Sequence, residues 1–378
     1  MVNAFHAKQS AVKVQLTHIP GQSEYRQRLT ADFAAGTPAD IVLINYRRFA
    51  GFAAKGTLEP LGPYLDKSSL IKRDDFYTES MGAFDWNGQL TCIPQNLSSL
   101  VVYYNKNLFD QAGLAYPKDD WTWEEFQATA QALTIDADND GNPEQYGLGT
   151  EASIFRVTPF IWQNGGDLVD DPAKPTRLNL NTPEAAGALE WFTDLQVKHH
   201  VIPSREQELA EPHEVRFLNG RLGMILNSRR GVPTYREITS FDWDVAPLPT
   251  GKSRAGILHA DGYCMAAASQ EKIAAWAFIE FANSVEGQTL VAASGRTVPS
   301  LRSVAESPAF LDPNAKPANS RVFLDVIPYI RSVPVMDTWV DIEEIMNIEF
   351  ERALHGDIGY DEAMRLATER SAEFFPQP

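Results

Sequence analysis

Short strand-like runs alternate with helical patterns in the first third of the chain, and this order constrains the fold most strongly. Residues 12–19 (VKVQLTHI) alternate apolar and polar side chains, as a half-buried strand does. Residues 24–35 have a helical pattern that ends at Gly36, and residues 40–44 (DIVLI) form an apolar run typical of a parallel strand covered on both faces. The strand–helix–strand order predicts an α/β domain with a parallel sheet.

Later segments carry explicit helix-start signals. Thr122 and Glu125 have the spacing of a capping box, in which each side chain binds the other residue's backbone N–H. Thr182 is the expected cap of another helix, and Pro183 is its expected first residue. Apolar residues then recur on one face of that helix: Ala185, Ala188, Leu189, Phe192 and Leu195. These patterns predict helices packed on a core.

Composition limits the partners that the chain can bind. It has 378 residues, with 33 basic and 50 acidic side chains and a formal net charge of −17. This charge repels phosphate backbones and anionic lipid surfaces, so nucleic-acid and membrane-surface binding are not expected. No apolar run approaches the ~20 residues of a membrane span. The length indicates roughly two to three domains, and without a low-complexity linker we expect ordered connecting strands.

The two cysteines allow two interpretations. Cys92 and Cys264 lie in strand-like stretches, LTCIP and GYCMAAA, outside any CxxC or metal-ligand spacing. Buried thiols are the preferred interpretation, because free cysteine is among the most buried residue types. A single disulfide in an oxidising compartment remains the alternative.

An acidic segment resembles part of a calcium-binding loop. Asp136, Asp138 and Asp140 occupy loop positions 1, 3 and 5, with glycine at the sixth position, as in an EF-hand. Glu144 is at the ninth position, but the twelfth is Gly147 instead of the bidentate glutamate. We therefore favour an acidic surface turn, with a structural calcium ion held by these four carboxylates as the alternative.

Longer motifs, in order along the chain, resemble the family of extracellular solute-binding proteins that includes maltose-binding protein and serves ATP-driven sugar importers. They include GTPADIVLIN, NGQLTCIPQNLSSLVVYYNKNLFDQAGL, WQNGGDLVDD, FLNGRLGMILN and FDWDVAPLPTG. No single motif is specific, and their order and spacing carry the resemblance over nearly the whole chain. The start, MVNAFHAKQS, lacks the basic and apolar regions of a signal peptide, and the family's first strand and half a helix are expected upstream.

The resemblance implies a periplasmic-binding-protein fold of type 2, with two α/β lobes joined by crossing strands and a ligand cleft between them. Residues 1–107 and 261–318 would form lobe 1, and residues 108–260 and 319–378 would form lobe 2. It also implies a monomeric, periplasmic or extracellular receptor that closes on a sugar or oligosaccharide and delivers it to the membrane subunits of an ABC importer. A lipid anchor on the precursor is left open.

Sugars present C–H faces and hydroxyl rims, so their sites need aromatic faces and planar side chains that make paired hydrogen bonds. In α/β sheets such groups belong on loops at strand ends. With the resemblance, this chemistry selects Tyr46, Arg47, Asn96, Ser98, Glu151, Phe155, Ser228, Arg229, Asp261, Tyr263, Arg296 and Trp339. The structural alternatives are a helix start at residues 46–48, turn chemistry at residues 95–98 and core packing for Trp339. Several arginines would also suit an acidic sugar.

A carbohydrate-active hydrolase is the rival hypothesis. It needs a carboxylate pair with split pKa values or an activated nucleophile. Glu124 and Glu125 are better explained by helix capping, and the sequence has no GxSxG elbow, P-loop or HExxH motif. A receptor for a non-sugar solute, such as a glycerophosphate, is a third hypothesis. We expect no catalytic residue and no required cofactor.

Overall fold

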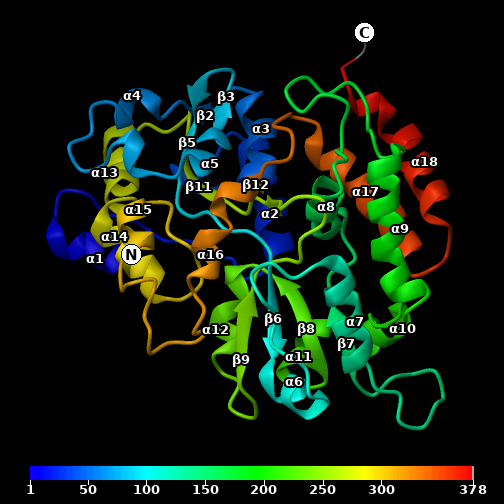
Figure 1. The fold of residues 1–378 in the computed structure, drawn as a ribbon. Helices are drawn as coiled ribbons and strands as arrows, with labels where there is room; N and C mark the ends of the chain where they lie inside the picture. The colour runs from blue at the N-terminus through cyan, green and yellow to red at the C-terminus, as the bar shows by residue number, and fades with distance from the viewer. Residues whose placement is uncertain (377–378) are drawn as a thin grey trace. The chain divides into compact units, whose positions relative to one another are not determined.

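Two four-stranded sheets organise residues 1–376, the part of the chain that the computed structural model describes (Figure 1). Each sheet belongs to one of two units. Unit 1 comprises Met1–Leu97, His259–Leu311 and Val335–Asp337, and unit 2 comprises the remaining described residues. The mixed α/β architecture confirms the predicted fold class. The structure assigns residues 98–107 to unit 2, whereas the predicted boundary places them in lobe 1, because their strand pairs only within the sheet of unit 2. It also places residues 312–318 in unit 2 and residues 259–260 and 335–337 in unit 1, opposite to the predicted lobes.

Unit 1 combines short strands with helices of varied length. Its strands are β1 (Ile41–Asn45), β2 (Leu58–Glu59), β3 (Asp85–Trp86), β4 (Gln89–Leu90), β5 (Cys92–Pro94) and β11 (Asp261–Ala266). Its helices are α1 (Val2–Lys8), α2 (Gln22–Ala34), α3 (Tyr46–Ala53), α4 (Gly62–Leu65), α5 (Thr78–Gly82), α13 (Lys272–Ala282), α14 (Val285–Ala293) and α15 (Arg302–Ala305). In the main sheet β11 pairs with β1, β2 and β5.

The pairing in this sheet corrects the prediction of a parallel sheet. β11 runs antiparallel to each of its three neighbours. Its first residue, Asp261, lies opposite Asn45, the last residue of β1. The chain returns to unit 1 at His259, so β11 enters the sheet where β1 ends and must run in the opposite direction. Sequence periodicity identifies a strand but carries no information about this direction.

Residues 12–19, predicted to be a strand, form none in the structure. Val12 and Val14 instead pack against an aromatic cluster that α1 and α13 share. The backbone N–H of Val14 donates to Nε2 of His6 at 2.9 Å. The alternating apolar residues therefore reflect packing against two helices, since no strand is paired with this segment in the described chain.

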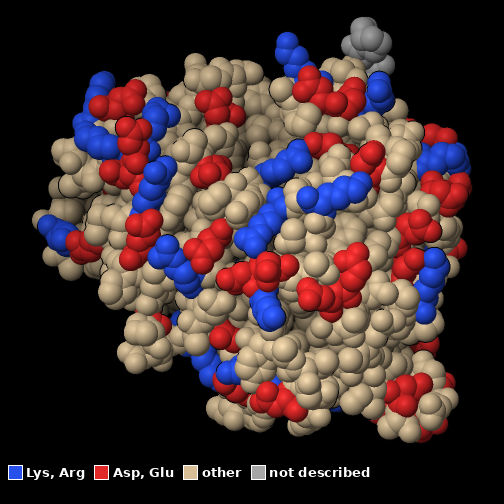
Figure 2. Space-filling view, in the orientation of Figure 1, with Lys and Arg blue, Asp and Glu red and all other residues tan. Residues whose placement is uncertain are grey.

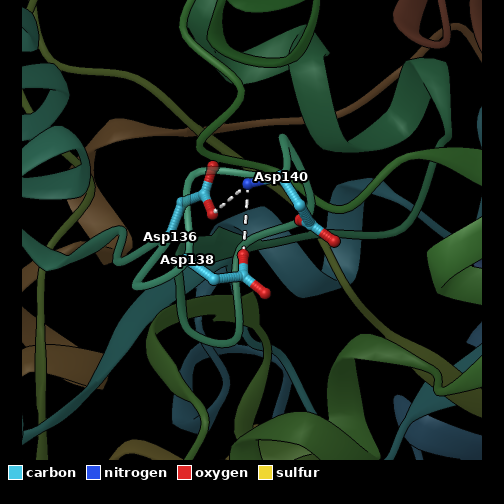
Figure 3. A group of neighbouring side chains, drawn as sticks. All are labelled: Asp136, Asp138 and Asp140. Atoms are coloured by element: carbon cyan, nitrogen blue, oxygen red, sulfur yellow. Dashed lines mark hydrogen bonds between the residues drawn. The ribbon is translucent and has the colours of Figure 1, made fainter.

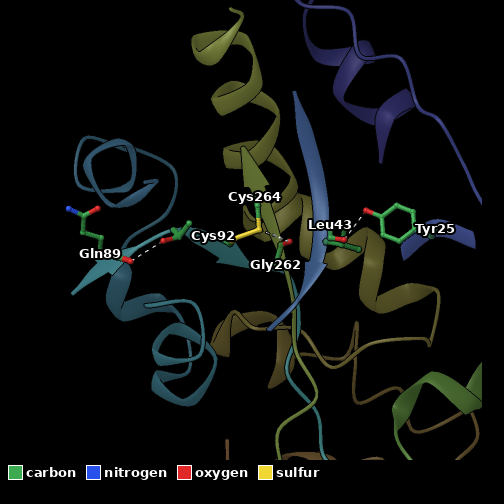
Figure 4. Close-up of a disulfide and its surroundings, with 7 residues drawn as sticks. Tyr25, Leu43, Gln89, Cys92, Gly262 and Cys264 are labelled. Carbon is green, nitrogen blue, oxygen red and sulfur yellow. Dashed lines mark hydrogen bonds between the residues drawn. A yellow bond between two sulfur atoms is a disulfide. The ribbon is translucent and has the colours of Figure 1, made fainter. Parts of the chain in front are cut away.

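A disulfide joins Cys92 and Cys264 (Figure 4), which corrects the preference for free thiols. The two residues are direct partners in the antiparallel pairing of β5 and β11. Their Cα atoms are 4.4 Å apart, the spacing of a non-hydrogen-bonded cross-strand pair and within the range that a disulfide spans. The bond depends on a pairing between residues 172 positions apart in the sequence.

Unit 2 contains the larger share of the helices. Its strands are β6 (Val101–Asn105), β7 (Tyr146–Gly149), β8 (Leu222–Asn227), β9 (Trp243–Ala246), β10 (Gly256–Ile257) and β12 (Ile330–Arg331). Its helices are α6 (Lys106–Ala112), α7 (Trp123–Leu133), α8 (Ile154–Gln163), α9 (Pro183–Val197), α10 (Arg205–Ala210), α11 (His213–Leu218), α12 (Val232–Tyr235), α16 (Val322–Asp325), α17 (Trp339–Leu354) and α18 (Tyr360–Ser371). The sheet order is β7-β8-β6-β9, with fully buried β6 and β8 inside.

The predicted helix starts of unit 2 are confirmed. The Thr122 side chain accepts from the Glu125 N–H, and the Glu125 carboxylate accepts from the Thr122 N–H at 2.8 Å. Pro183 begins α9 after the Thr182 cap, and the five apolar residues predicted for one face of α9 are buried. These signals succeed because each depends on neighbours within a few positions.

The charged side chains of the sequence are distributed over the surface of the protein. On the face drawn in Figure 2, basic and acidic side chains are both spread over the surface. Among the described residues, the helices are too short or too polar to cross a bilayer.

Candidate functional site

A cluster of polar side chains lies at one end of the sheet of unit 1. Nδ2 of Asn45, the last residue of β1, donates to Oδ1 of Asp261 at 3.1 Å and to the Ala260 carbonyl at 3.2 Å. Nδ2 of Asn96 lies 3.4 Å from the other carboxylate oxygen, Oδ2 of Asp261. Amides on two different chain segments therefore fix the Asp261 carboxylate, and each of its oxygens retains lone-pair capacity.

Two further groups extend this cluster. Nε2 of Gln95 donates to the Tyr263 hydroxyl at 2.8 Å, which leaves the O–H of Tyr263 free to donate elsewhere. The backbone N–H of Gln95 donates to the Asp261 carbonyl at 2.8 Å. Burial raises the pKa of the Tyr263 phenol, against the lowering effect of Gln95, so the hydroxyl keeps its proton at neutral pH. We call Asn45, Gln95, Asn96, Asp261 and Tyr263 the polar cluster.

The structure brings Asn96, Asp261 and Tyr263 of the predicted set together in the polar cluster, which is partly exposed apart from buried Asn96. Asn45 and Gln95 are not in the predicted set, although each adjoins a selected residue. The register partner of Asn45 is Asp261, and that pairing was not predicted from the sequence. Strand-end position is the sequence signal that points to both residues.

The other candidates of unit 1 are not part of the polar cluster, although Tyr46 and Arg47 directly follow Asn45. Tyr46 is a core residue with 1% of its surface exposed. The Arg47 N–H donates to Oδ1 of Asn45 at 3.3 Å, which caps α3 in the way that the helix-start alternative describes. Arg296 is exposed in the loop after α14. Their roles as ligand contacts stay predictions.

Arg229 is an interior residue of unit 2, with 1% of its surface exposed. Its Nη1 donates to Oγ of Ser320 at 3.1 Å, and its guanidinium lies 5.0 Å from the ring centre of Phe323. Burial lowers the pKa of Arg229 to about 10, so it stays charged at neutral pH. Ser98 and Ser228 are also buried. These contacts hold unit 2 together, and ligand contact by the three residues stays a prediction.

Glu151 presents an exposed carboxylate before α8. The buried guanidinium of Arg156 binds its Oε2 through Nε and Nη2, at 3.2 and 2.9 Å. Desolvation alone would raise the pKa of Glu151, but the charge and hydrogen bonds of Arg156 outweigh it and lower the pKa. Arg156 was not predicted from the sequence. Phe155, beside it on α8, is largely buried.

Trp339 begins α17 and has 1% of its surface exposed. Its indole N–H finds no hydrogen-bond acceptor among the described residues. Buried donors almost always have an acceptor, so this one calls for a specific explanation.

The carboxylates of the acidic segment close a turn (Figure 3). The N–H of Asp140 donates to Asp136 at 3.2 Å and to Asp138 at 3.1 Å. The Gly141 N–H donates to the second Asp136 oxygen at 3.0 Å. Oxygens of the three aspartates lie within 4.8 Å of one another. The Glu144 carboxylate accepts from a backbone N–H at 2.9 Å.

The missing twelfth ligand of the loop has a packing explanation. Gly147 is part of β7, and a Cβ at this position would overlap the carbonyl oxygen of Ala130 on α7. A glutamate cannot occupy the position without separating the strand from the helix. The turn therefore explains the carboxylates, and calcium binding stays a prediction.

Comparison with known proteins agrees with this architecture. The family model of bacterial extracellular solute-binding proteins matches residues 1–289. The structure of an ABC substrate-binding protein from Listeria monocytogenes in complex with cycloalternan superposes with a TM-score of 0.91 at 26% identity, covering 99% of this chain and 95% of that one. A mannitol-binding protein of Pseudomonas aeruginosa is 25% identical, over 92% of this chain and 83% of its own length.

The sn-glycerol-3-phosphate-binding periplasmic protein of Escherichia coli K12 is 24% identical over 66% of this chain and 57% of its own length. The family match covers far more than half of the sequence and agrees with the motifs spread along it. The chain belongs to the family of bacterial extracellular solute-binding proteins.

Proposed function

We propose that this protein is the sugar receptor of an ABC importer, and that the polar cluster binds the hydroxyls of a saccharide. The observation that carries the proposal is the Asp261 carboxylate, which the amides of Asn45 and Asn96 hold from two sides. A fixed carboxylate accepts from two neighbouring hydroxyls of a sugar without first losing side-chain freedom. The Tyr263 hydroxyl adds a donor beside it.

The composition of the polar cluster favours a neutral polyol. It contains one carboxylate and four uncharged groups, and its negative charge would repel a phosphate or a sugar acid. The charge of Arg229 suggested an acidic sugar, but its guanidinium contacts Ser320 and Phe323 inside unit 2. The similar proteins described with cycloalternan and mannitol support this choice. A glycerophosphate receptor is the alternative solute class.

Unit 2 supplies two further candidates. The exposed Glu151 carboxylate is kept ionised by Arg156 and accepts hydroxyl hydrogen bonds. The Trp339 indole N–H has no acceptor among the described residues, but Trp339 is 1% exposed, so its contact with a ligand stays a prediction from the sequence. In this account both carboxylates act as hydrogen-bond acceptors, and the protein is a receptor without catalytic activity.

The proposed receptor acts as a monomer in the periplasm or outside the cell and passes its ligand to membrane subunits. The Cys92–Cys264 disulfide supports this location, because such bonds persist in oxidising compartments. Family membership supports the transport role.

Replacement of Asp261 tests the proposed site. We expect Asp261→Ala to weaken saccharide binding about 10- to 100-fold, because hydrogen bonds to a charged group contribute about 1.5–3 kcal/mol. Isothermal titration calorimetry measures the change, with the saccharide that most stabilises the wild type in a thermal-shift screen.

Asp40→Ala is the matched control, because Asp40 is an exposed aspartate that precedes β1 at the opposite end of the same strand. It should bind like the wild type. Equal affinity of the wild type and a folded Asp261→Ala variant would contradict the assignment.

A further inference from the structure

Unit 2 contains a pocket that the polar cluster does not include. It has a volume of about 190 Å³. Leu100, Leu248 and Val322 line it with buried apolar surface, and Val326 adds a half-buried wall. All of its lining residues belong to unit 2, whereas the polar cluster belongs to unit 1.

The mouth of the pocket is polar and aromatic. Tyr329 is 40% exposed, and the guanidinium of Arg254 lies 5.6 Å from its ring centre. Nη2 of Arg254 donates to the backbone carbonyl of Asp119 at 2.9 Å, which anchors the guanidinium and leaves its other donors for a ligand. Asp119 and Asp325, both exposed, also line the pocket, and Nε of Arg321 donates to Oδ1 of Asp325 at 3.1 Å.

The pocket has room for one ring. A protein cavity of about 150 Å³ holds a benzene molecule, whereas drug-sized ligands need about 300–1,000 Å³. A volume of about 190 Å³ therefore suits a single six-membered ring. An oligosaccharide would extend beyond it.

The lining selects the chemistry of that ring. An apolar floor and a tyrosine wall suit the C–H face of a pyranose, and carboxylates with a guanidinium suit its hydroxyl rim. A wholly apolar ring would make no hydrogen bonds to the polar groups at the mouth, and a phosphate would meet two carboxylates. A neutral hexopyranose satisfies both parts of the lining.

We propose that this pocket is a second saccharide site, which binds one neutral monosaccharide independently of the polar cluster. The inference goes beyond the proposed function, which concerns the polar cluster alone. Its affinity should be weak, because the pocket encloses one ring and most of its polar groups are exposed to water.

Saturation-transfer NMR and calorimetry with D-glucose, D-galactose and D-mannose test the second site. We expect at least one hexose to bind both the wild type and Asp261→Ala at millimolar concentration. Val326→Phe fills the pocket. Combined with Asp261→Ala, it should weaken the hexose binding that Asp261→Ala alone retains at least fivefold. Tyr329→Ala should weaken that binding at least fivefold.

Matched variants separate this result from general damage. Val285→Phe and Tyr116→Ala change exposed residues of the same types outside the pocket, and we expect wild-type hexose binding from both. Thermal melting checks that each variant is folded, and Tyr329→Ala changes an exposed position that the fold tolerates.

Equal hexose binding by Asp261→Ala and by Asp261→Ala combined with Val326→Phe would overturn the second site, as would the absence of hexose binding from Asp261→Ala alone. If only the proposed function fails, Asp261→Ala binds like the wild type while Val326→Phe still weakens hexose binding. The two proposals therefore fail in distinguishable ways.

Discussion

Removal of the Cys92–Cys264 disulfide is expected to lower the free energy of unfolding of unit 1 by about 2–5 kcal/mol. The bond closes a loop between residues 172 positions apart, and the entropy that a crosslink removes from the unfolded chain increases with loop length. It also links two strands of only three and six residues, which pair over three register positions.

The same bond fixes the geometry of the polar cluster. Cys92 lies three positions before Gln95, and Cys264 lies three positions after Asp261. Loss of the bond should therefore also weaken saccharide binding, because the strands that carry these side chains would separate more easily.

Urea denaturation of the wild type and of the Cys92→Ala, Cys264→Ala double variant measures the stability effect. A reducing agent should move the transition of the wild type towards that of the double variant and leave the double variant unchanged. An identical transition in both proteins would show that the disulfide does not stabilise unit 1.

Replacement of Glu349 by alanine is expected to cost about 2–4 kcal/mol in unit 2. Glu349 on α17 is fully buried and binds two arginines, Arg352 on the same helix at 2.7 Å and Arg370 on α18. Its loss leaves a cavity and removes the charge that holds the two helices together. The partial exposure of both arginines keeps the expected cost below that of a wholly buried ion pair.

Glu362→Ala is the matched control for this variant. Glu362 lies on α18 and pairs with Arg365 at 2.8 Å, but both side chains are exposed to solvent. We expect its urea transition to coincide with that of the wild type. Equal transitions for Glu349→Ala and Glu362→Ala would contradict the role of the buried carboxylate.

Local sequence patterns predicted the parts of the fold that depend on close neighbours. The Thr122–Glu125 capping box and the Thr182 cap each involve residues three positions apart, and both are confirmed. The pairing of β1 with β11 joins residues more than two hundred positions apart, and the parallel sheet predicted from the order of strands and helices was wrong. The disulfide depended on another such pairing.

In the candidate site, too, residues placed by local sequence position were predicted, and contacts from distant segments were not. Asp261 and Tyr263 come shortly after His259, where the chain returns from unit 2 to unit 1. Their position at the start of a strand therefore helped to identify them as candidates. Arg229 has an equally polar setting in the sequence, yet Phe323 and Ser320, on a distant segment, enclose its side chain. Burial of a charged residue by a distant segment leaves no local pattern.

Calorimetric titration of the wild-type protein tests whether it is a receptor for a neutral saccharide. The ligands are neutral mono- and oligosaccharides, mannitol and sn-glycerol 3-phosphate, and chromatography of each mixture detects turnover. We predict tight stoichiometric binding of a neutral saccharide or polyol without turnover, and no binding of the phosphate. Failure of every neutral ligand to bind, selective binding of the phosphate, or hydrolysis of a bound saccharide would contradict the account.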